Sequence, residues 1–182
     1  IYAIIDRRRK FPASVLLRAI GFSLNQDIFS AFGLTKKYKI SDSKNLIDKL
    51  ILDDMVDEST GEVLIEKKSI INKDTINILK KLHIKEIELL DDCKDNEVAI
   101  EVLLNTMEKD PTNNSSEAVL LLYQHLRTGE APDIEVATKI IEKMFFSTKK
   151  YDLGAVGRYR INKKFGLKNP VDEPVLTRAD FV

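Results

Sequence analysis

Apolar residues recur at helical spacing near the start of the chain. The spacing predicts a helix over Ala13 to Ile20, ended by Gly21, and a second short helix over Leu24 to Phe32. Ahead of them, Tyr2 to Asp6 alternates β-forming residues, which predicts a strand. The chain is therefore expected to open with a strand and two short helices.

The middle of the chain mixes strand and helix patterns. Val56 to Glu66 alternates apolar and polar residues about Thr60-Gly61, which predicts a hairpin. A helix is expected from Asn72 or Asp74 to about Leu82, and a further strand from Ile84 to Leu90. We expect residues 36–97 to form a small mixed α/β insertion on a core of its own.

The second half of the chain is more strongly helical. One helix is expected over Glu97 to Lys109, and Asn114 with Glu117 forms a capping-box pattern that starts the next. Pro132-Asp133 opens a third, whose apolar stripe consists of Ala137, Ile140, Ile141, Met144 and Phe145. The expected fold class is α+β, with a helix-rich domain made of residues 1–35 and 98–182 and the insertion between them.

The bulk composition suits one compact domain or two small ones. Of 182 residues, 29 are basic and 29 acidic, so the total charge predicts neither a polyanionic partner nor attraction to an anionic membrane. A single cysteine, Cys93, rules out an internal disulfide, and with abundant Lys and Glu it favours a reducing, cytoplasmic location.

No feature of the chain predicts membrane insertion. No stretch approaches the roughly 18 apolar residues that a membrane span needs. Ile1 to Arg9 lacks the apolar region of a signal peptide and begins without Met in mid-strand. Since Val182 falls within a new helix-like pattern, the chain is expected to be part of a longer polypeptide.

The neutral total charge hides three charged stretches. Asp6 to Arg18 has five basic residues against one acid, a net of +4, and Lys149 to Lys168 has seven against one, a net of +6. Asp42 to Glu62 has two basic residues against seven acids, a net of −5. If the two basic stretches lie together, they form a phosphate-binding surface whose affinity falls with salt. The alternative is that each stretch is a solvated face.

Catalytic and metal-binding patterns are missing from the sequence. His83 and His125 have no Cys or His at metal-ligand spacing, and Cys93 lacks a motif that would lower its pKa. Asp53, Asp54 and Asp57 lack the tight D-x-D spacing of catalytic carboxylates, and no glycine-rich phosphate loop is present. Nothing in the sequence predicts catalysis.

Several longer motifs go beyond composition. Ile5 to Gly21, IDRRRKFPASVLLRAIG, resembles a segment of the bacterial RNA polymerase β subunit. The same subunit's lobe has motifs similar to DESTGEV at 57–63, DPTN at 110–113, LRTGEAPD at 126–133 and FFSTKKYDLGAVGRYRINKKF at 145–165, in this order. The resemblance is specific for about half the chain. Thr128 and Ala131 stand where the family often has Pro. Lys150 stands where Arg is common, and Lys cannot make the bidentate phosphate contact that Arg makes.

The resemblance implies a non-catalytic role within a larger enzyme. The lobe of this family lies on one side of the main cleft, over the duplex and the displaced non-template strand. The aspartates that hold Mg²⁺ for phosphoryl transfer belong to the β′ subunit, so no cofactor is expected in this chain. The implied partners are DNA and the polymerase α, β′ and sigma subunits, in a cytoplasmic, nucleoid-associated enzyme.

The residues expected to bind nucleic acid follow from the resemblance and the basic stretches. They are Arg7, Arg8, Arg9, Lys10, Arg127, Glu130, Lys150, Arg158 and Arg160. Tyr151 and Tyr159 could stack on an unpaired base or complete the core of the lobe. The alternative function is a protein-interaction module for transcription regulators, in which the acidic stretch 42–62 binds a basic partner.

Overall fold

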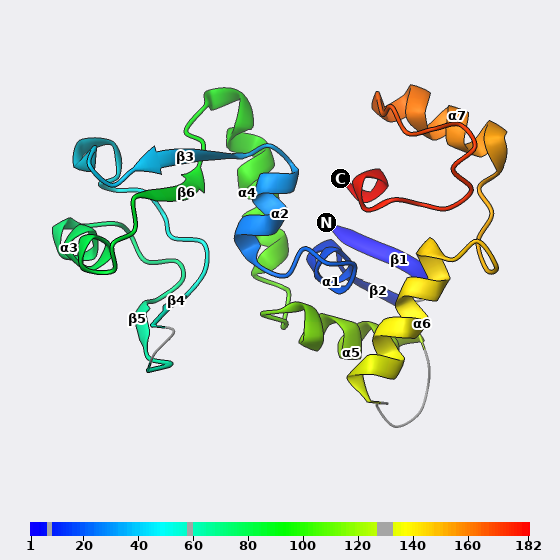
Figure 1. Ribbon diagram of the computed structural model, residues 1–182, viewed down its shortest axis with the longest axis horizontal. Helices are drawn as coiled ribbons and strands as arrows, with labels where there is room; N and C mark the ends of the chain where they lie inside the picture. Colours follow the sequence, from blue (N-terminus) through cyan, green and yellow to red (C-terminus); the bar gives the residue numbers. More distant parts are fainter. Residues whose placement is uncertain (7–8, 58–59, 127–132) are drawn as a thin grey trace. The chain divides into compact units, whose positions relative to one another are not determined.

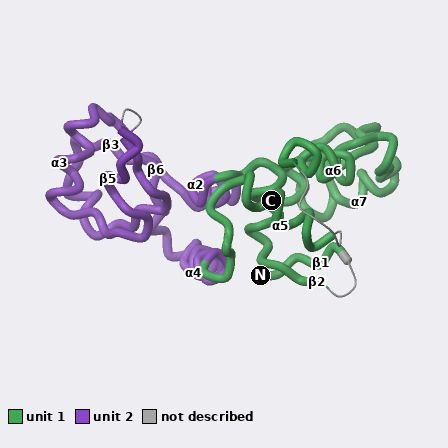
Figure 2. Tube along the Cα trace, turned by 90° about the horizontal axis from the view of Figure 1, so that it is seen from below, with its two compact units in different colours: residues 1–23, 108–182 green, residues 24–107 purple. Residues whose placement is uncertain are grey.

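The chain forms two compact units in the computed structural model, which describes residues 1–6, 9–57, 60–126 and 133–182 (Figure 1). Unit 1 consists of residues 1–23 and 108–182, and unit 2 of residues 24–107 (Figure 2). The described residues form helices and short antiparallel strand pairs, so the expected α+β fold class is confirmed.

Unit 1 begins with a two-stranded ladder, and its other regular elements, among the described residues, are helices. β1 (Tyr2–Asp6) pairs antiparallel with β2 (Arg9–Pro12), with Tyr2 opposite Pro12. The helices of this unit are α1 (Ala13–Ala19), α5 (Ser115–Leu126), α6 (Ile134–Phe146), α7 (Gly154–Phe165) and the short 3-10 helix η3 (Arg178–Phe181).

One apolar core holds the first part of unit 1 together. α1 packs against α5, and α5 packs against α6. Their shared core consists of Phe11, Val15, Ala19, Ala118, Val119, Leu122, Ala137 and Ile141. Within each helix, the core positions recur at helical spacing because only one face of the helix is removed from water.

A buried ion pair ties α1 to the segment that leads into α5. Arg18 Nε donates to Asp110 Oδ2 over 3.2 Å, with the two side chains only 3% and 1% exposed. The other oxygen of Asp110 accepts from the Thr112 backbone N–H at 2.8 Å and from its hydroxyl at 2.6 Å. Two of the motifs that carry the family resemblance, around Arg18 and at 110–113, thus meet in one structural contact.

The described residues of unit 2 form two small antiparallel ladders and three α helices. Its elements are α2 (Asn25–Ala31), β3 (Thr35–Lys39), η1 (Ser43–Asn45), β4 (Met55–Val56), β5 (Val63–Ile65), α3 (Lys73–Lys81), β6 (Glu86–Leu90), η2 (Lys94–Asn96) and α4 (Glu97–Met107). β3 pairs with β6, and β4 pairs with β5. The expected hairpin about 60–61, the helix after Asn72 and the following strand are therefore confirmed.

The extent of unit 2 differs from the expected insertion of residues 36–97. Residues 24–35 and 98–107, which the sequence analysis grouped with the terminal segments, pack within unit 2. The reason is a shared apolar cluster in which Phe29 of α2 and Leu103 of α4 contact Leu34 and Leu52. The assignment of a DNA-facing domain and an insertion stays a prediction.

Candidate nucleic-acid interface

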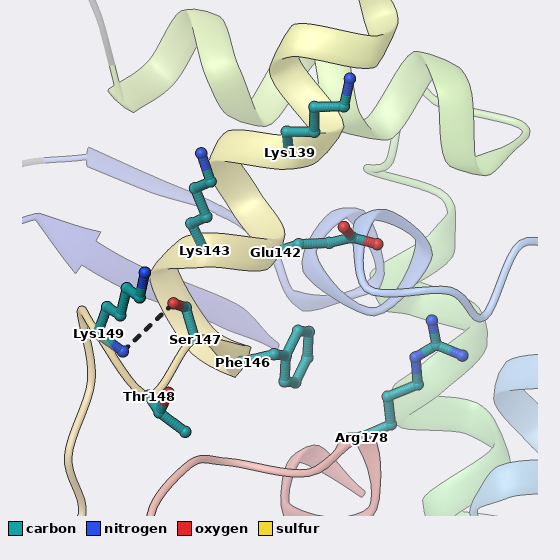
Figure 3. A pocket seen from close by; sticks show the side chains of 8 residues that line it. All are labelled: Lys139, Glu142, Lys143, Phe146, Ser147, Thr148, Lys149 and Arg178. Atoms are coloured by element: carbon teal, nitrogen blue, oxygen red, sulfur yellow. Dashed lines mark hydrogen bonds between the residues drawn. The ribbon is translucent and has the colours of Figure 1, made fainter.

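An open groove in unit 1 gathers cationic side chains along α6 and the turn that follows it. The groove has a volume of about 570 Å³ and is lined by Lys139, Glu142, Lys143, Phe146, Ser147, Thr148, Lys149 and Arg178 (Figure 3). We call it the α6 groove. Four cations against one carboxylate give it a local net charge of +3.

The helix pattern of α6 explains why these charges share one surface. Ala137 and Ile141 are buried in the core, so residues on the opposite side face solvent. Lys139 and Lys143 are four residues apart and lie on the same outward face. The Lys139 Nζ lies 3.8 Å from Glu135 Oε2. Both side chains are largely exposed, so the ion pair holds the Lys139 ammonium group only weakly.

A tight turn after α6 adds two more lysines to this surface. The Ser147 carbonyl accepts from the backbone N–H groups of Lys150 at 3.0 Å and Tyr151 at 2.9 Å. The Ser147 hydroxyl accepts from the Lys149 N–H at 3.4 Å, which Figure 3 marks with a dashed line. Lys149 and Lys150 are both exposed, so their ammonium groups are free to meet an anion.

Arg178 enters the groove from η3. In Figure 3, Glu142 and Phe146 extend from α6 toward Arg178, whereas Lys143 and Lys149 extend on the other side of the helix end. The guanidinium of Arg178 also lies against Gly21: a Cβ placed on Gly21 would be 3.0 Å from Arg178 Cζ. Gly21 has a φ of +121°, so a side chain there would be strained as well as crowded.

Arg158, a predicted phosphate contact, is fully buried. Its Nη1 donates to both carboxylate oxygens of Asp180 at 2.7 and 2.8 Å, and its Nε donates to the Glu173 carbonyl at 3.4 Å. Its Nη2 donates to the Val175 carbonyl. The prediction for Arg158 is therefore wrong, because the guanidinium that would bind a phosphate is enclosed by residues 15 to 22 positions further along.

The partner of Arg158 anchors η3. The Asp180 side chain is 1% exposed, and its carboxylate also accepts from the Thr177 N–H at 2.6 Å and the Thr177 hydroxyl at 3.0 Å. Burial raises the pKa of Asp180, but the hydrogen bonds from Arg158 and Thr177 outweigh it, so the pKa lies below its ordinary value. Because Arg178 belongs to the same short helix, Arg158 acts on the α6 groove as a positioning residue.

Aromatic packing joins η3 to the end of α6. Phe181 makes edge-to-face contacts with Phe145 and Phe146, at ring-centroid distances of 5.4 and 6.2 Å. The Phe146 ring also lines the groove. Packing and the buried ion pair therefore hold the Arg178 side of the groove against the α6 side.

The other predicted contact residues are scattered over unit 1. Arg9 is half-buried and donates to the His125 carbonyl, while the Lys10 ammonium lies 5.4 Å from the centre of the Tyr2 ring. Arg160 is exposed on α7. Four further predicted residues lie outside the described residues: Arg7, Arg8, Arg127 and Glu130.

The two tyrosines considered for base stacking differ in exposure. Tyr159 is 54% exposed on α7, whereas Tyr151 is half-buried in the turn after α6. Only Tyr159 thus offers most of a ring face to solvent. His125, for which the sequence offered no metal-ligand spacing, packs its ring edge-on against Phe11 at a centroid distance of 6.0 Å.

Two carboxylates of the acidic stretch make hydrogen bonds within unit 2. The Asp53 carboxylate accepts from the N–H groups of Asn25 and Gln26 at 2.9 and 2.7 Å, which caps the start of α2. Asp54 accepts from the Lys67 N–H at 2.6 Å. These carboxylates are occupied by the fold, so they provide little support for a docking surface at 42–62.

None of the residues that line the α6 groove is among those expected to bind nucleic acid. Of its four cations, only Lys149 was counted at all, as part of the basic stretch 149–168, whereas Lys139, Lys143 and Arg178 were missed. The two lysines have a sequence signal, since an i, i+4 pair on the polar face of a helix precedes Lys149 and Lys150. Arg178 has none, because it joins the groove only through the packing of η3. Among the described residues, no group of three or more His, Cys, Asp or Glu side chains is arranged to hold a metal ion.

None of the helices that the structure describes has the length and apolar character needed to cross a bilayer.

Comparisons with known proteins point to one family. The family model described as RNA polymerase Rpb2, domain 2, matches residues 1–182. The chain is similar to the DNA-directed RNA polymerase subunit beta of Flavobacterium psychrophilum, at 41% identity over 200 residues, and of Flavobacterium johnsoniae, at 40% over 200. It is also 38% identical over 199 residues to that of Bacteroides thetaiotaomicron. Each match covers 100% of this chain but 16% of the relative.

Proposed function

The chain belongs to the RNA polymerase Rpb2 domain 2 family, and we propose that it is a non-catalytic segment of a bacterial RNA polymerase β subunit that lines the DNA cleft. In this role it contacts phosphates of the duplex and the non-template strand during transcription. The chain spans about 16% of the length of the relatives. Nucleotidyl transfer by the whole enzyme, and assembly with α, β′ and sigma subunits, are therefore part of the proposal.

The observation that carries the proposal is the α6 groove. Three lysines and Arg178 surround a groove of about 570 Å³ that also holds two side-chain hydroxyls, Ser147 and Thr148. Ammonium groups bind phosphates as point charges, and hydroxyls add hydrogen bonds to phosphate oxygens. This combination suits a nucleic-acid backbone better than a neutral ligand.

The binding expected from this groove is independent of base sequence. Lysine contacts to phosphates fix the position of a strand and carry no direct sequence information. Each phosphate neutralised adds about 0.9 to the slope of log affinity against log salt. If Lys139, Lys143 and Lys149 each neutralise one phosphate, they contribute roughly 2.7 to that slope.

Other exposed cations of unit 1 are further candidates for phosphate contact. Lys150 follows the groove directly in the sequence, and Lys10 and Arg160 are exposed elsewhere on unit 1. We keep Arg9 as a weaker candidate, since its guanidinium is already hydrogen-bonded to a carbonyl. Arg7, Arg8, Arg127 and Glu130 stay predictions of the sequence.

We assign the chemistry of nucleotide addition to another polypeptide. The resemblance attributes the Mg²⁺-binding aspartates to the β′ subunit, and this chain supplies the positioning of DNA. The proposed location is the cytoplasm, in association with the nucleoid. The cations of the α6 groove act by holding a nucleic-acid strand and take no part in bond making.

A charge-matched pair of variants tests the proposal in the assembled polymerase. The groove variant carries Lys139→Gln, Lys143→Gln and Lys149→Gln. The control removes the same charge from exposed lysines of α3, with Lys73→Gln, Lys80→Gln and Lys81→Gln. Affinity for bubble DNA is measured by fluorescence anisotropy across a range of salt concentrations.

The proposal expects the groove variant to lower both affinity and salt slope, the latter by up to about 2.7. The control should stay close to the parent enzyme, since its charges lie outside the groove. Equal effects of the two triple variants would mean that only total charge matters, and an unchanged salt slope in the groove variant would refute phosphate contact there.

A further inference from the structure

A second groove, in unit 2, has an apolar floor and an acidic rim. Its lining residues follow the chain from the end of β6 through η2 into α4, and it has a volume of about 540 Å³. Its apolar lining is formed by Leu90, Ile100 and Leu104, all half-buried. We call it the α4 groove.

The floor of the α4 groove continues an internal core. Leu90, Ile100 and Leu104 pack from outside against the cluster that contains Phe29 and Leu103. Ile100 and Leu104 are four residues apart, so they form a short apolar ridge along α4. A ridge of this kind can receive the side chains of a second helix.

Further apolar surface lies on the adjoining face of α4. Val98 is 72% exposed and Val102 is 39% exposed, and their spacing places them on one face of the helix. Single exposed apolar residues are common on protein surfaces. Val98 and Val102, on one face of the helix beside an apolar groove, extend the apolar area that a partner could cover.

Carboxylates surround this apolar surface. Asp91, Asp92, Glu97 and Glu101 line the groove, with Lys94 as the only cation among its described lining residues. Asp92 is paired with Lys49.

The remaining three carboxylates are available to a partner. Within the described ranges, Asp91, Glu97 and Glu101 have no cation at salt-bridge distance. Glu97 lies in the first turn of α4, where the helix dipole favours a negative charge. The helix dipole does not account for the negative charges of Asp91 and Glu101.

We propose that the α4 groove docks a basic amphipathic helix of a partner protein. Apolar side chains of that helix, spaced three or four residues apart, would cover Ile100 and Leu104, and its flanking Lys or Arg would meet Asp91, Glu97 and Glu101. The charge of the rim selects this occupant, since the carboxylates repel nucleic-acid phosphates and acidic peptides. The inference rests on unit 2 alone and is independent of the proposed contact between the α6 groove and DNA.

Cys93 provides a direct test. It is the one cysteine of the chain, is exposed and lines the groove. The probe is a synthetic basic amphipathic helical peptide that carries one thiopyridyl-activated cysteine. In the assembled polymerase, the Cys93 thiolate attacks the probe disulfide, a mixed disulfide forms and thiopyridone leaves. The rate is followed by mass spectrometry of the proteolytic fragment that contains Cys93.

Docking raises the effective concentration of the probe at Cys93. We therefore expect the amphipathic probe to react about tenfold faster or more than a peptide of the same composition in scrambled order. Glu97→Gln with Glu101→Gln should slow the reaction about fivefold, as expected for the loss of two exposed ion pairs. The matched control, Glu62→Gln with Glu66→Gln, removes the same charge from exposed positions around β5 and should leave the rate unchanged.

Three results would overturn the inference. Equal rates for the amphipathic and scrambled probes would show attraction by charge alone, without apolar docking. Equal slowing by the two double variants would show that the rim has no special role. Protection of Cys93 by duplex DNA at low salt would identify the surface as one that nucleic acid covers instead.

Discussion

Replacing Asp180 with Asn removes the charge from the buried pair with Arg158 and leaves the guanidinium enclosed without a counter-ion. Breaking a buried ion pair by changing one partner costs about 3–5 kcal/mol. The penalty should fall on residues 167–182, because Arg158 contacts the carbonyls of Glu173 and Val175 as well as Asp180. Opening of this segment should then become roughly 150- to 5,000-fold more frequent.

Amide hydrogen exchange of the complete β subunit measures this opening directly. Exchange in residues 167–182 should accelerate in the Asp180→Asn variant, while residues of α5 keep their protection. The control is Lys163→Gln on the exposed side of α7, which should change stability by less than about 0.5 kcal/mol. Unchanged exchange at 167–182 would refute the view that this ion pair holds η3 in place.

A double variant separates loss of the pair from loss of packing. Arg158→Met with Asp180→Leu removes both charges together and leaves no buried ion without a partner. Apolar replacement of a buried pair is often close to neutral, so the double variant should be more stable than Asp180→Asn. If the double variant is less stable than Asp180→Asn, the hydrogen bonds of Arg158 to the backbone carbonyls contribute more to stability than the ion pair does.

The pH dependence of this contact has a defined sign. The pKa of Asp180 in the folded chain lies below 3.8, its ordinary value. Its contribution is therefore complete above that value and is lost as the pH falls through the lower, folded pKa. In the Asp180→Asn variant, the part of the acid-induced opening of residues 167–182 that comes from protonation of Asp180 should be absent.

Three further outcomes are expected. The Thr35 hydroxyl lowers the pKa of Glu88, so Glu88→Gln should cost about 1 kcal/mol in urea unfolding at pH 7 and progressively less as the pH falls through that lowered pKa. Gly21→Ala should lower the melting temperature and weaken binding of bubble DNA, because it strains a positive φ and displaces Arg178. Asp53→Ala should cost about 1 kcal/mol and speed amide exchange at the start of α2. Unchanged exchange there would contradict the capping role.

Local patterns were enough to predict many of the elements. The hairpin about 60–61 and the helix after Asn72 depend on contacts between residues near in sequence, namely turn geometry and an N-cap. The boundary of unit 2 depends on contacts between distant residues. Phe29 and Leu103 are 74 positions apart and share one cluster, which no local periodicity reports.

The same limit applies to the predicted site residues. Counting charges located the basic stretch 149–168 but could not separate exposed Lys149 from buried Arg158. A partner 22 residues away, Asp180, decides that difference. Arg18 was counted in the first basic stretch and is likewise buried, against Asp110. Long-range ion pairs therefore turn apparent ligand residues into structural ones.

The most direct test of the central claim is a photo-crosslink from the α6 groove to DNA. A photoreactive benzoylphenylalanine replaces Lys143 in the β subunit of an assembled transcription complex on bubble DNA, and in a second enzyme it replaces the exposed Lys81 of α3. If the α6 groove holds DNA, position 143 crosslinks to DNA and high salt removes the crosslink, whereas position 81 gives little or none. Crosslinks from position 143 only to protein, or equal DNA crosslinking from both positions, would contradict it.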